Sequence, residues 1–118
     1  MTRKDLEDRT KKFHVDVIKL CESLPRSAAG FETAKQVIRS AGSVGANYRA
    51  TRRAKSATDF IYKIEIVLEE ADETHYWLEV IKLSGMIINN SFLDILIQEA
   101  FELTAIFTSS AKTSKQKK

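Results

Sequence analysis

The sequence predicts an all-α protein, folded as an antiparallel up-down-up-down four-helix bundle, and three observations lead to this prediction. Apolar residues recur at three- and four-residue intervals in four segments, which is the period of a helix with one buried face. The 118 residues include four glycines and one proline, which favours a few long helices over many strands. The connections between the segments are short, and short connections favour antiparallel neighbours. We expect one domain over residues 1–111, followed by a lysine-rich flexible tail over residues 112–118.

The first helix is predicted over about residues 5–23. The residues that keep the helical spacing, and should therefore face the core, are Leu6, Thr10, Phe13, Val17, Leu20 and Leu24. Asp5 suits the positive end of the helix dipole. Pro25 ends the helix, because proline lacks the N–H group that a helix interior requires. Ser27 is a candidate N-cap for the second helix.

The second helix, expected over residues 31–55, separates into three stripes when it is wound at about 100° per residue. The apolar stripe, expected to face the core, contains Ala34, Ile38, Ala41, Gly45 and Tyr48. The basic ridge beside it contains Lys35, Arg39, Arg49 and Arg53, and is widened by Arg52 and Lys55. The small polar stripe, expected to point away from the core, contains Thr33, Ser40, Asn47 and Thr51. Glycine costs about 1 kcal/mol relative to alanine in a helix interior, so Gly42 and Gly45 indicate close approach by neighbouring helices.

The third helix is expected over residues 57–83, with Ser56 as its N-cap and Gly85 as its left-handed C-terminal residue. Its predicted core face contains Phe60, Ile64, Val67, Leu68, Ala71, His75 and Leu78. An acidic stripe on one side contains Glu65, Glu69, Asp72 and Glu79. The fourth helix is expected over about residues 91–110. Its predicted inward-facing residues are Leu93, Leu96, Ala100, Leu103, Thr104 and Phe107.

The second and third predicted helices carry opposite charge. Residues 31–55 contain six basic residues and one acid, whereas residues 57–83 contain two lysines and seven acids. We expect some ion pairs where the two helices adjoin. Exposed pairs contribute only ~0–1 kcal/mol each, so they should bias the register of the helices more than their stability.

Three segments resemble the bacterial "four helix bundle protein" family: RSAGSVGANYR at residues 39–49, DFIYKI at residues 59–64 and EADETHYWLE at residues 70–79. This family includes proteins encoded in intervening sequences of large-subunit ribosomal RNA genes, and relatives of the accessory variability determinant of diversity-generating retroelements. The resemblance implies an up-down four-helix bundle, a cyclic homopentamer as in characterised relatives, and no known enzymatic activity. In the retroelement branch it also implies binding of nucleic acid and of a reverse transcriptase.

Within the first of these segments we assign a structural role to Arg39, Ser40, Gly45 and Asn47, and we expect Arg39 to be buried in the packing. Four apolar residues project away from the predicted core faces and are candidates for a subunit interface: Ile66, Trp77, Ile95 and Ile106. The alternative is that these four residues cover a wide core in a small monomer.

Catalytic and metal-binding patterns are weak in this sequence. Asp72 and His75 have the i, i+3 spacing of di-iron bundles, but such sites need a second motif and two further carboxylates, and the other histidine, His14, has Lys11 at the matching offset. Cys21 has no partner for a disulfide or a thiolate zinc site, and its apolar neighbours indicate a buried, inert thiol. We therefore expect no enzyme, no metal and no cofactor. The charged amino terminus and the short apolar runs predict a cytoplasmic protein without membrane contact.

Two functions of different classes remain. The first is a homo-oligomeric accessory protein that binds RNA or DNA phosphates through the basic ridge, with Lys35, Arg49, Arg52, Arg53 and Lys55 as the candidate residues. The second is a structural scaffold for another protein, in which the arginines form ion pairs. The net charge of +3 is too small to decide between them.

Overall fold

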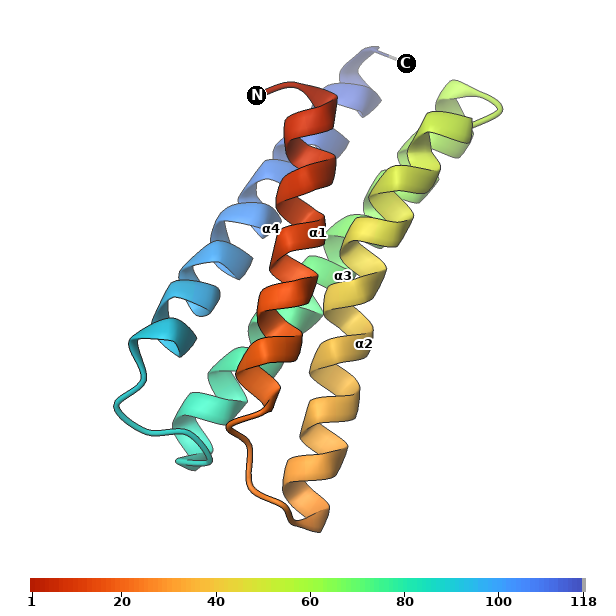
Figure 1. The fold of residues 1–118 in the computed structure, drawn as a ribbon. Helices are drawn as coiled ribbons and strands as arrows, with labels where there is room; N and C mark the ends of the chain where they lie inside the picture. Colours follow the sequence, from red (N-terminus) through yellow and green to blue (C-terminus); the bar gives the residue numbers. More distant parts are fainter. Residues whose placement is uncertain (118) are drawn as a thin grey trace.

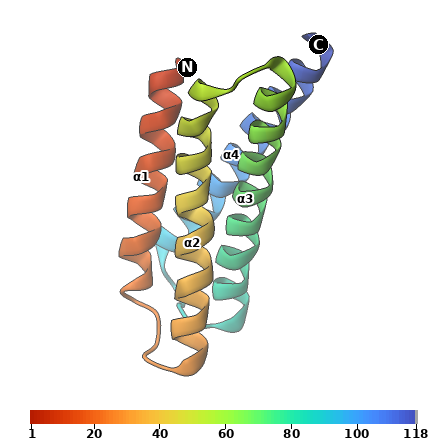
Figure 2. The same ribbon diagram turned by 90° about the vertical axis from the view of Figure 1, so that its right-hand side faces the viewer.

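The computed structural model describes residues 1–117. Over this range it contains the helices α1 (Arg3–Cys21), α2 (Ala28–Ala50), α3 (Ala57–Ser84) and α4 (Ser91–Lys117), with a short 3-10 helix, η1 (Thr51–Arg53), after α2. Successive helices run in opposite directions (Figure 1), so the predicted up-down-up-down four-helix bundle is confirmed. Figure 2 shows α2 between α1 and α3, and α4 completes the bundle by packing against α3 and α1.

Short side chains and one glycine set the ends of the helices. Ser27 accepts a hydrogen bond from the Gly30 amide at 3.1 Å, and Ser56 accepts one from the Asp59 amide at 3.0 Å, so both predicted N-caps are confirmed. Gly85 has φ +76°, the left-handed conformation expected at the end of α3. α1 begins earlier than predicted because Thr2 forms a capping box at its N-terminus.

The core is continuous along the bundle, and two helices contribute the residues predicted from the sequence. All six residues expected from α1 are buried. Five of the six expected from α4 are buried as well, and the sixth, Thr104, is half-buried and donates a hydrogen bond to the Ala100 carbonyl at 2.8 Å. α1 and α4 each bury a single arc, which a spacing pattern locates well.

The predicted inward face of α2 is partly wrong. Ala41 and Tyr48 are buried as expected, but Ala34, Ile38 and Gly45 are only half-buried, whereas Val37 and Val44 are fully buried. The small polar stripe is also misplaced: Thr33, Ser40 and Thr51 were expected to point away from the core, and all three are buried. The physical reason is that α1 and α3 cover α2 from two sides, which makes its buried arc wider than one apolar stripe.

α3 shows the same kind of error, and two helix ends also differ. Phe60, Leu68 and His75 are half-buried rather than in the core, and Ile61, Thr74 and Ile81 take the buried positions. α2 ends at Ala50, before the predicted residue 55, because η1 follows and Ala54 is extended, with ψ 137°. α4 continues past the predicted residue 110, and its Lys115 lies 3.1 Å from Glu65 Oε2.

The described part of the predicted tail, residues 112–117, is therefore helical. Lys118, the last residue of that tail, lies outside the described residues. None of the helices within residues 1–117 combines the length and the apolar character needed to cross a membrane.

Candidate nucleic-acid interface

Arg39 belongs to the contact between α2 and α3. Its guanidinium lies 2.9 Å from Glu70 Oε2 and also contacts Glu73 Oε2, so the expected ion pairing between these oppositely charged helices is confirmed. Hydrogen bonds to Glu73 and Glu70 raise the pKa of Arg39 above its ordinary value. The side chain is 48% exposed, so the expectation that Arg39 is buried is wrong. Its position beside two carboxylates holds it away from other anions.

Arg52 is also held within the protein. Its Nη2 lies 2.7 Å from Glu7 Oε1, and the other oxygen of that carboxylate lies 3.1 Å from Arg3 Nε. Arg3 in turn donates to the Tyr48 carbonyl at 3.1 Å and to Thr51 Oγ1 at 2.6 Å. This network fastens the start of α1 to the end of α2, so Arg52 contributes to the packing of the two helices.

The remaining cations of the basic ridge are free of such contacts. Among residues 1–117, Lys35, Arg49, Arg53 and Lys55 take part in no ion pair, and all four are exposed. Arg49 and Arg53 lie about one helical turn apart, whereas Lys35 is about 21 Å from Arg49 along α2 at 1.5 Å per residue. The structure therefore groups Arg49 with Arg53 and separates Lys35 from them.

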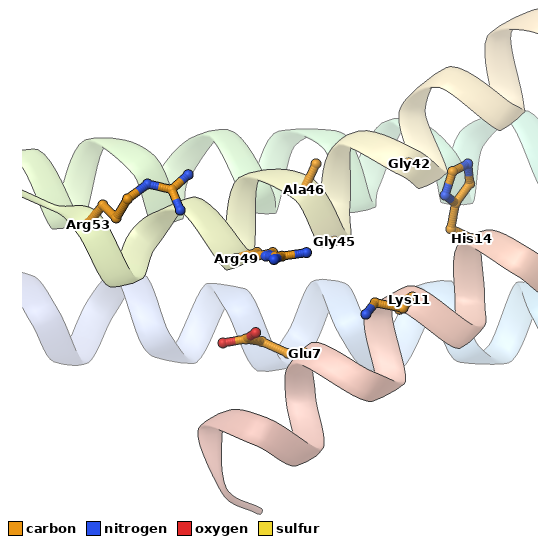
Figure 3. Close-up of a pocket in the computed structure, with 8 residues that line it drawn as sticks. All are labelled: Glu7, Lys11, His14, Gly42, Gly45, Ala46, Arg49 and Arg53. Atoms are coloured by element: carbon orange, nitrogen blue, oxygen red, sulfur yellow. The ribbon is translucent and has the colours of Figure 1, made fainter.

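A cavity of about 320 Å³ lies between α1 and α2, and Arg49 and Arg53 form part of its lining. Figure 3 shows the eight lining residues, which are Glu7, Lys11, His14, Gly42, Gly45, Ala46, Arg49 and Arg53. A Cβ added at Gly42 would lie 2.9 Å from His14 Cε1 and Nε2. A Cβ added at Gly45 would lie 3.4 Å from Thr10 Oγ1. The two glycines thus allow α1 to approach α2 closely, as their presence in the helix indicated.

Lys11 and His14 were not among the residues predicted for a binding site. A signal for them exists in the sequence, because Glu7, Lys11 and His14 have the i, i+4, i+7 spacing of one helix face. That spacing does not say which helix the face meets. The structure shows that it meets the glycines of α2.

One end of the bundle gathers positive charge. The start of α1, the end of α2, the start of α3 and the end of α4 all lie at this end (Figures 1 and 2). Residues 49–63 contain five basic residues and one acid, and residues 108–117 contain three lysines and no acid. The single acid, Asp59, accepts a hydrogen bond from the Lys55 amide at 2.9 Å, which lowers the pKa of its carboxyl below the ordinary value. Asp59 also contacts Lys63, and among residues 1–117 it forms no ion pair with Arg53 of η1.

Of the remaining residues of the structural motif, Ser40 is buried and Asn47 is half-buried. Ser40 Oγ lies 2.9 Å from Thr74 Oγ1 and donates to the Val37 carbonyl at 3.2 Å. Asn47 Nδ2 donates to the Ser43 carbonyl at 2.9 Å. These bonds satisfy polar groups where α2 meets its neighbours, as buried or half-buried polar atoms require.

The candidate interface residues differ in their exposure. Ile95 is 62% exposed, while Ile66, Trp77 and Ile106 are half-buried. Trp77 Nε1 donates to Glu73 Oε2 at 3.2 Å, and both Trp77 and Ile106 pack against the core. A subunit interface through these residues stays a prediction.

His75 and Cys21 occupy structural positions. His75 Nδ1 lies 3.6 Å from Glu79 Oε1, and its ring packs on Phe101 with centroids 6.2 Å apart. Burial raises the pKa of the Cys21 thiol to about 11, so at neutral pH the sulfur carries its proton. Across residues 1–117, no group of three or more histidine, cysteine, aspartate or glutamate side chains is arranged to hold a metal ion.

The fold and the basic surface define a class: small four-helix-bundle proteins with a positively charged end. The chain belongs to the 23S rRNA-intervening sequence protein family, whose model matches residues 4–109, so the predicted family membership is confirmed. It is also similar to a solved structure of a protein of unknown function, from the S23 ribosomal protein family of Bacteroides thetaiotaomicron. That similarity has 32% identity and a TM-score of 0.83, and covers 95% of this chain and 99% of the other. Among curated proteins, none matches.

Proposed function

We propose that this protein is a non-enzymatic, cytoplasmic accessory protein that binds nucleic-acid phosphates with the basic end of its bundle. The observation that carries the proposal is a set of cations without an ion-pair partner among residues 1–117, which are Lys11, Arg49, Arg53 and Lys55, beside arginines that do have one. Uncompensated arginines on an exposed surface attract phosphate strongly, because the guanidinium fork donates two parallel hydrogen bonds. The family name, which refers to 23S ribosomal RNA, is consistent with such a partner.

Binding of this kind is expected to be weakly selective for sequence. The described aromatic residue nearest the arginines along α2 is Tyr48, and it is buried beneath Arg3, whose guanidinium carbon lies 4.9 Å from its ring. It is therefore not available to stack on bases. Contacts with phosphates depend on charge and carry no information about the base sequence. The affinity of such binding falls steeply as the salt concentration rises.

Assembly into a homo-oligomer, a pentamer by the sequence resemblance, would strengthen this binding. Several copies of a weak phosphate site gain avidity for a long polymer that a short one cannot provide. Ile95 supports a contact between copies, because it is a large apolar side chain left mostly exposed on α4.

The alternative function is a scaffold for another protein, and a specific observation favours it. Arg39 and Arg52, two members of the basic ridge, are held in ion pairs within the chain. In this alternative the partner is a protein, for which the sequence resemblance supplies a reverse transcriptase as the candidate. The free cations then face acidic groups of that partner.

A gel-shift titration with long RNA and with duplex DNA at low salt tests the proposal. The variant Arg49→Glu with Arg53→Glu should weaken binding by about tenfold or more, since hydrogen bonds to charged groups are the strong ones. The slope of log affinity against log salt should also become shallower by roughly two units. Arg52 is left unchanged because its loss would disturb the packing against Glu7.

The matched control is Lys19→Glu with Arg26→Glu, which changes the net charge equally at the opposite end of the bundle. Both residues are exposed and take part in no ion pair among residues 1–117. Binding by this control should stay close to that of the parent. If the parent shifts neither nucleic acid at micromolar concentration, the scaffold function replaces the proposal.

A further inference from the structure

The cavity between α1 and α2 carries positive charge that no residue of its own neutralises. Lys11, Arg49 and Arg53 line it, and none of the three takes part in an ion pair among residues 1–117. The one acid in the lining is Glu7, and its two oxygens are engaged by Arg3 and Arg52. Bringing like charges together without a counter-ion is unfavourable, so the arrangement suits an anion.

The floor of the cavity is made of residues with little or no side chain. Gly42, Gly45 and Ala46 form the α2 side. In Figure 3 the Lys11 ammonium and the Arg49 guanidinium lie in the space between the two helices. His14 lies against Gly42 and Thr10 lies against Gly45, so a ligand would lie beside this contact, where cations from both helices line the cavity.

His14 gives the cavity a flat aromatic wall. Its ring lies against Gly42, where the missing Cβ leaves room for it, and it is half-buried. Nucleic-acid bases stack on histidine as they do on other aromatic side chains. The ring thus offers a contact for a base. Gly42, against which the ring lies, precedes Arg49 by about two helical turns of α2.

The size of the cavity indicates a ligand larger than a bare ion. Its volume is about 320 Å³, which falls at the lower end of the roughly 300–1,000 Å³ typical of small-molecule sites. A bare phosphate ion would leave most of this volume unfilled. A phosphate ester with one ring system attached uses both the cations and the imidazole.

The geometry points to this cavity as the binding site for one nucleotide unit, with the phosphate on Lys11, Arg49 and Arg53 and the base against His14. The inference rests on the proposed function for the source of the nucleotide, which is then one unit of a bound strand. A free mononucleotide has the same chemistry, and the experiment distinguishes the two sources.

The four glycines allow a direct test by nuclear magnetic resonance, with adenosine 5′-monophosphate as the probe. Gly42 and Gly45 line the cavity, whereas Gly30 and Gly85 lie outside it and serve as internal controls. The amide signals of Gly42 and Gly45 should shift in a saturable way, and those of Gly30 and Gly85 should not. Adenosine or inorganic phosphate alone should bind more weakly than the intact nucleotide.

Two variants identify the cavity as the site. Ala46→Leu adds bulk at the edge of the cavity without changing any charge, and Ala46 is exposed, so the fold should tolerate the larger side chain. Lys11→Gln removes one cation, and its matched control is Lys19→Gln, two turns further along the same exposed side of α1. Ala46→Leu and Lys11→Gln should each raise the Kd for the nucleotide by about tenfold, and Lys19→Gln should leave it unchanged.

A titration of the same variants with long RNA shows whether the bound nucleotide is a unit of a strand or a free nucleotide. If Ala46→Leu weakens both ligands, the cavity takes a unit of the strand. If the nucleotide binds and RNA either does not bind or is unaffected by Ala46→Leu, the site takes a free nucleotide. If RNA binds and the nucleotide shifts neither Gly42 nor Gly45, the cavity inference is wrong while the proposed function stands. If neither ligand binds, both are wrong.

Discussion

The two sides of α2 are both rich in small residues, yet they make different contacts. Towards α3, Ser40 is fully buried, its Oγ lies 2.9 Å from Thr74 Oγ1, and Arg39 is held by two glutamates. Towards α1, Gly42 and Gly45 lie beside a cavity whose arginines have no ion pair among residues 1–117. The comparison teaches that small residues on α2 allow close packing on both sides, and that on the side towards α1 a cavity remains beside the contact.

The difference has a simple physical origin. Serine and threonine hydroxyls bring α2 and α3 together because their polar atoms are satisfied locally, as in the bond from Ser40 to the Val37 carbonyl. Glycines bring backbones together without supplying any atom to fill the remaining volume. Where the facing side chains of α1 are long and charged, the helices stay apart at their edges, and a cavity results.

The largest expected effect comes from placing the same side chain on the two sides of α2. Ala41→Leu should lower the free energy of unfolding by about 1–3 kcal/mol or more, because Ala41 is fully buried and its surroundings are already filled. Ala46→Leu, on the cavity side, should change it by less than about 0.5 kcal/mol. Urea denaturation of both variants measures the difference, and equal midpoints would remove the distinction between the two sides.

A smaller effect is expected from charge reversal. Arg39→Glu would place a third carboxylate beside Glu70 and Glu73, and should lower the free energy of unfolding by roughly 1 kcal/mol. Arg49→Glu removes no ion pair of the described part of the chain, and it should be close to neutral for stability while weakening RNA binding. Thermal unfolding should give a lower Tm for Arg39→Glu than for Arg49→Glu. This gap in Tm should narrow at about 1 M salt, where charges are screened within ~3 Å. A gap that is unchanged by salt would mean that Arg39 acts through packing instead.

The smallest effect concerns the glycine nearest His14. Gly42→Ala should raise the free energy of unfolding by about 0.5–1 kcal/mol in a His14→Ala background, because alanine restricts the unfolded chain and favours the helix. With His14 present the gain should be smaller, since the new Cβ would meet the imidazole at 2.9 Å and the ring must turn away. A double-mutant cycle measures this coupling. Zero coupling would show that the ring does not rest on Gly42 in solution.

Local signals in the sequence determined most of the fold. Serines before apolar runs marked the starts of α2 and α3, and Gly85 marked the end of α3, because caps depend on a few neighbouring residues. The core faces of α1 and α4 followed from spacing alone, since each of these helices buries one arc. The opposite charges of α2 and α3 likewise indicated the pairing that Arg39 makes.

The inward faces of α2 and α3 needed the tertiary structure. A helix that is covered from two sides buries polar residues such as Ser40 and Thr74 as well as apolar ones, and a hydropathy pattern assigns those residues to the solvent. Their burial is favourable only because each hydroxyl finds a partner, either on its own helix or on the neighbouring one.

For the candidate site, too, some features could be predicted from the sequence and others needed the structure. The sequence by itself determined that α2 carries a basic ridge with glycines within it, because both are properties of one helix. Only the tertiary structure decided that Arg39 and Arg52 are held by glutamates, and that Lys11 and His14 join Arg49 and Arg53 around one cavity. These contacts join residues about 30 to 45 positions apart, and their geometry depends on how closely the glycines of α2 let α1 approach, which no periodicity within a single helix records.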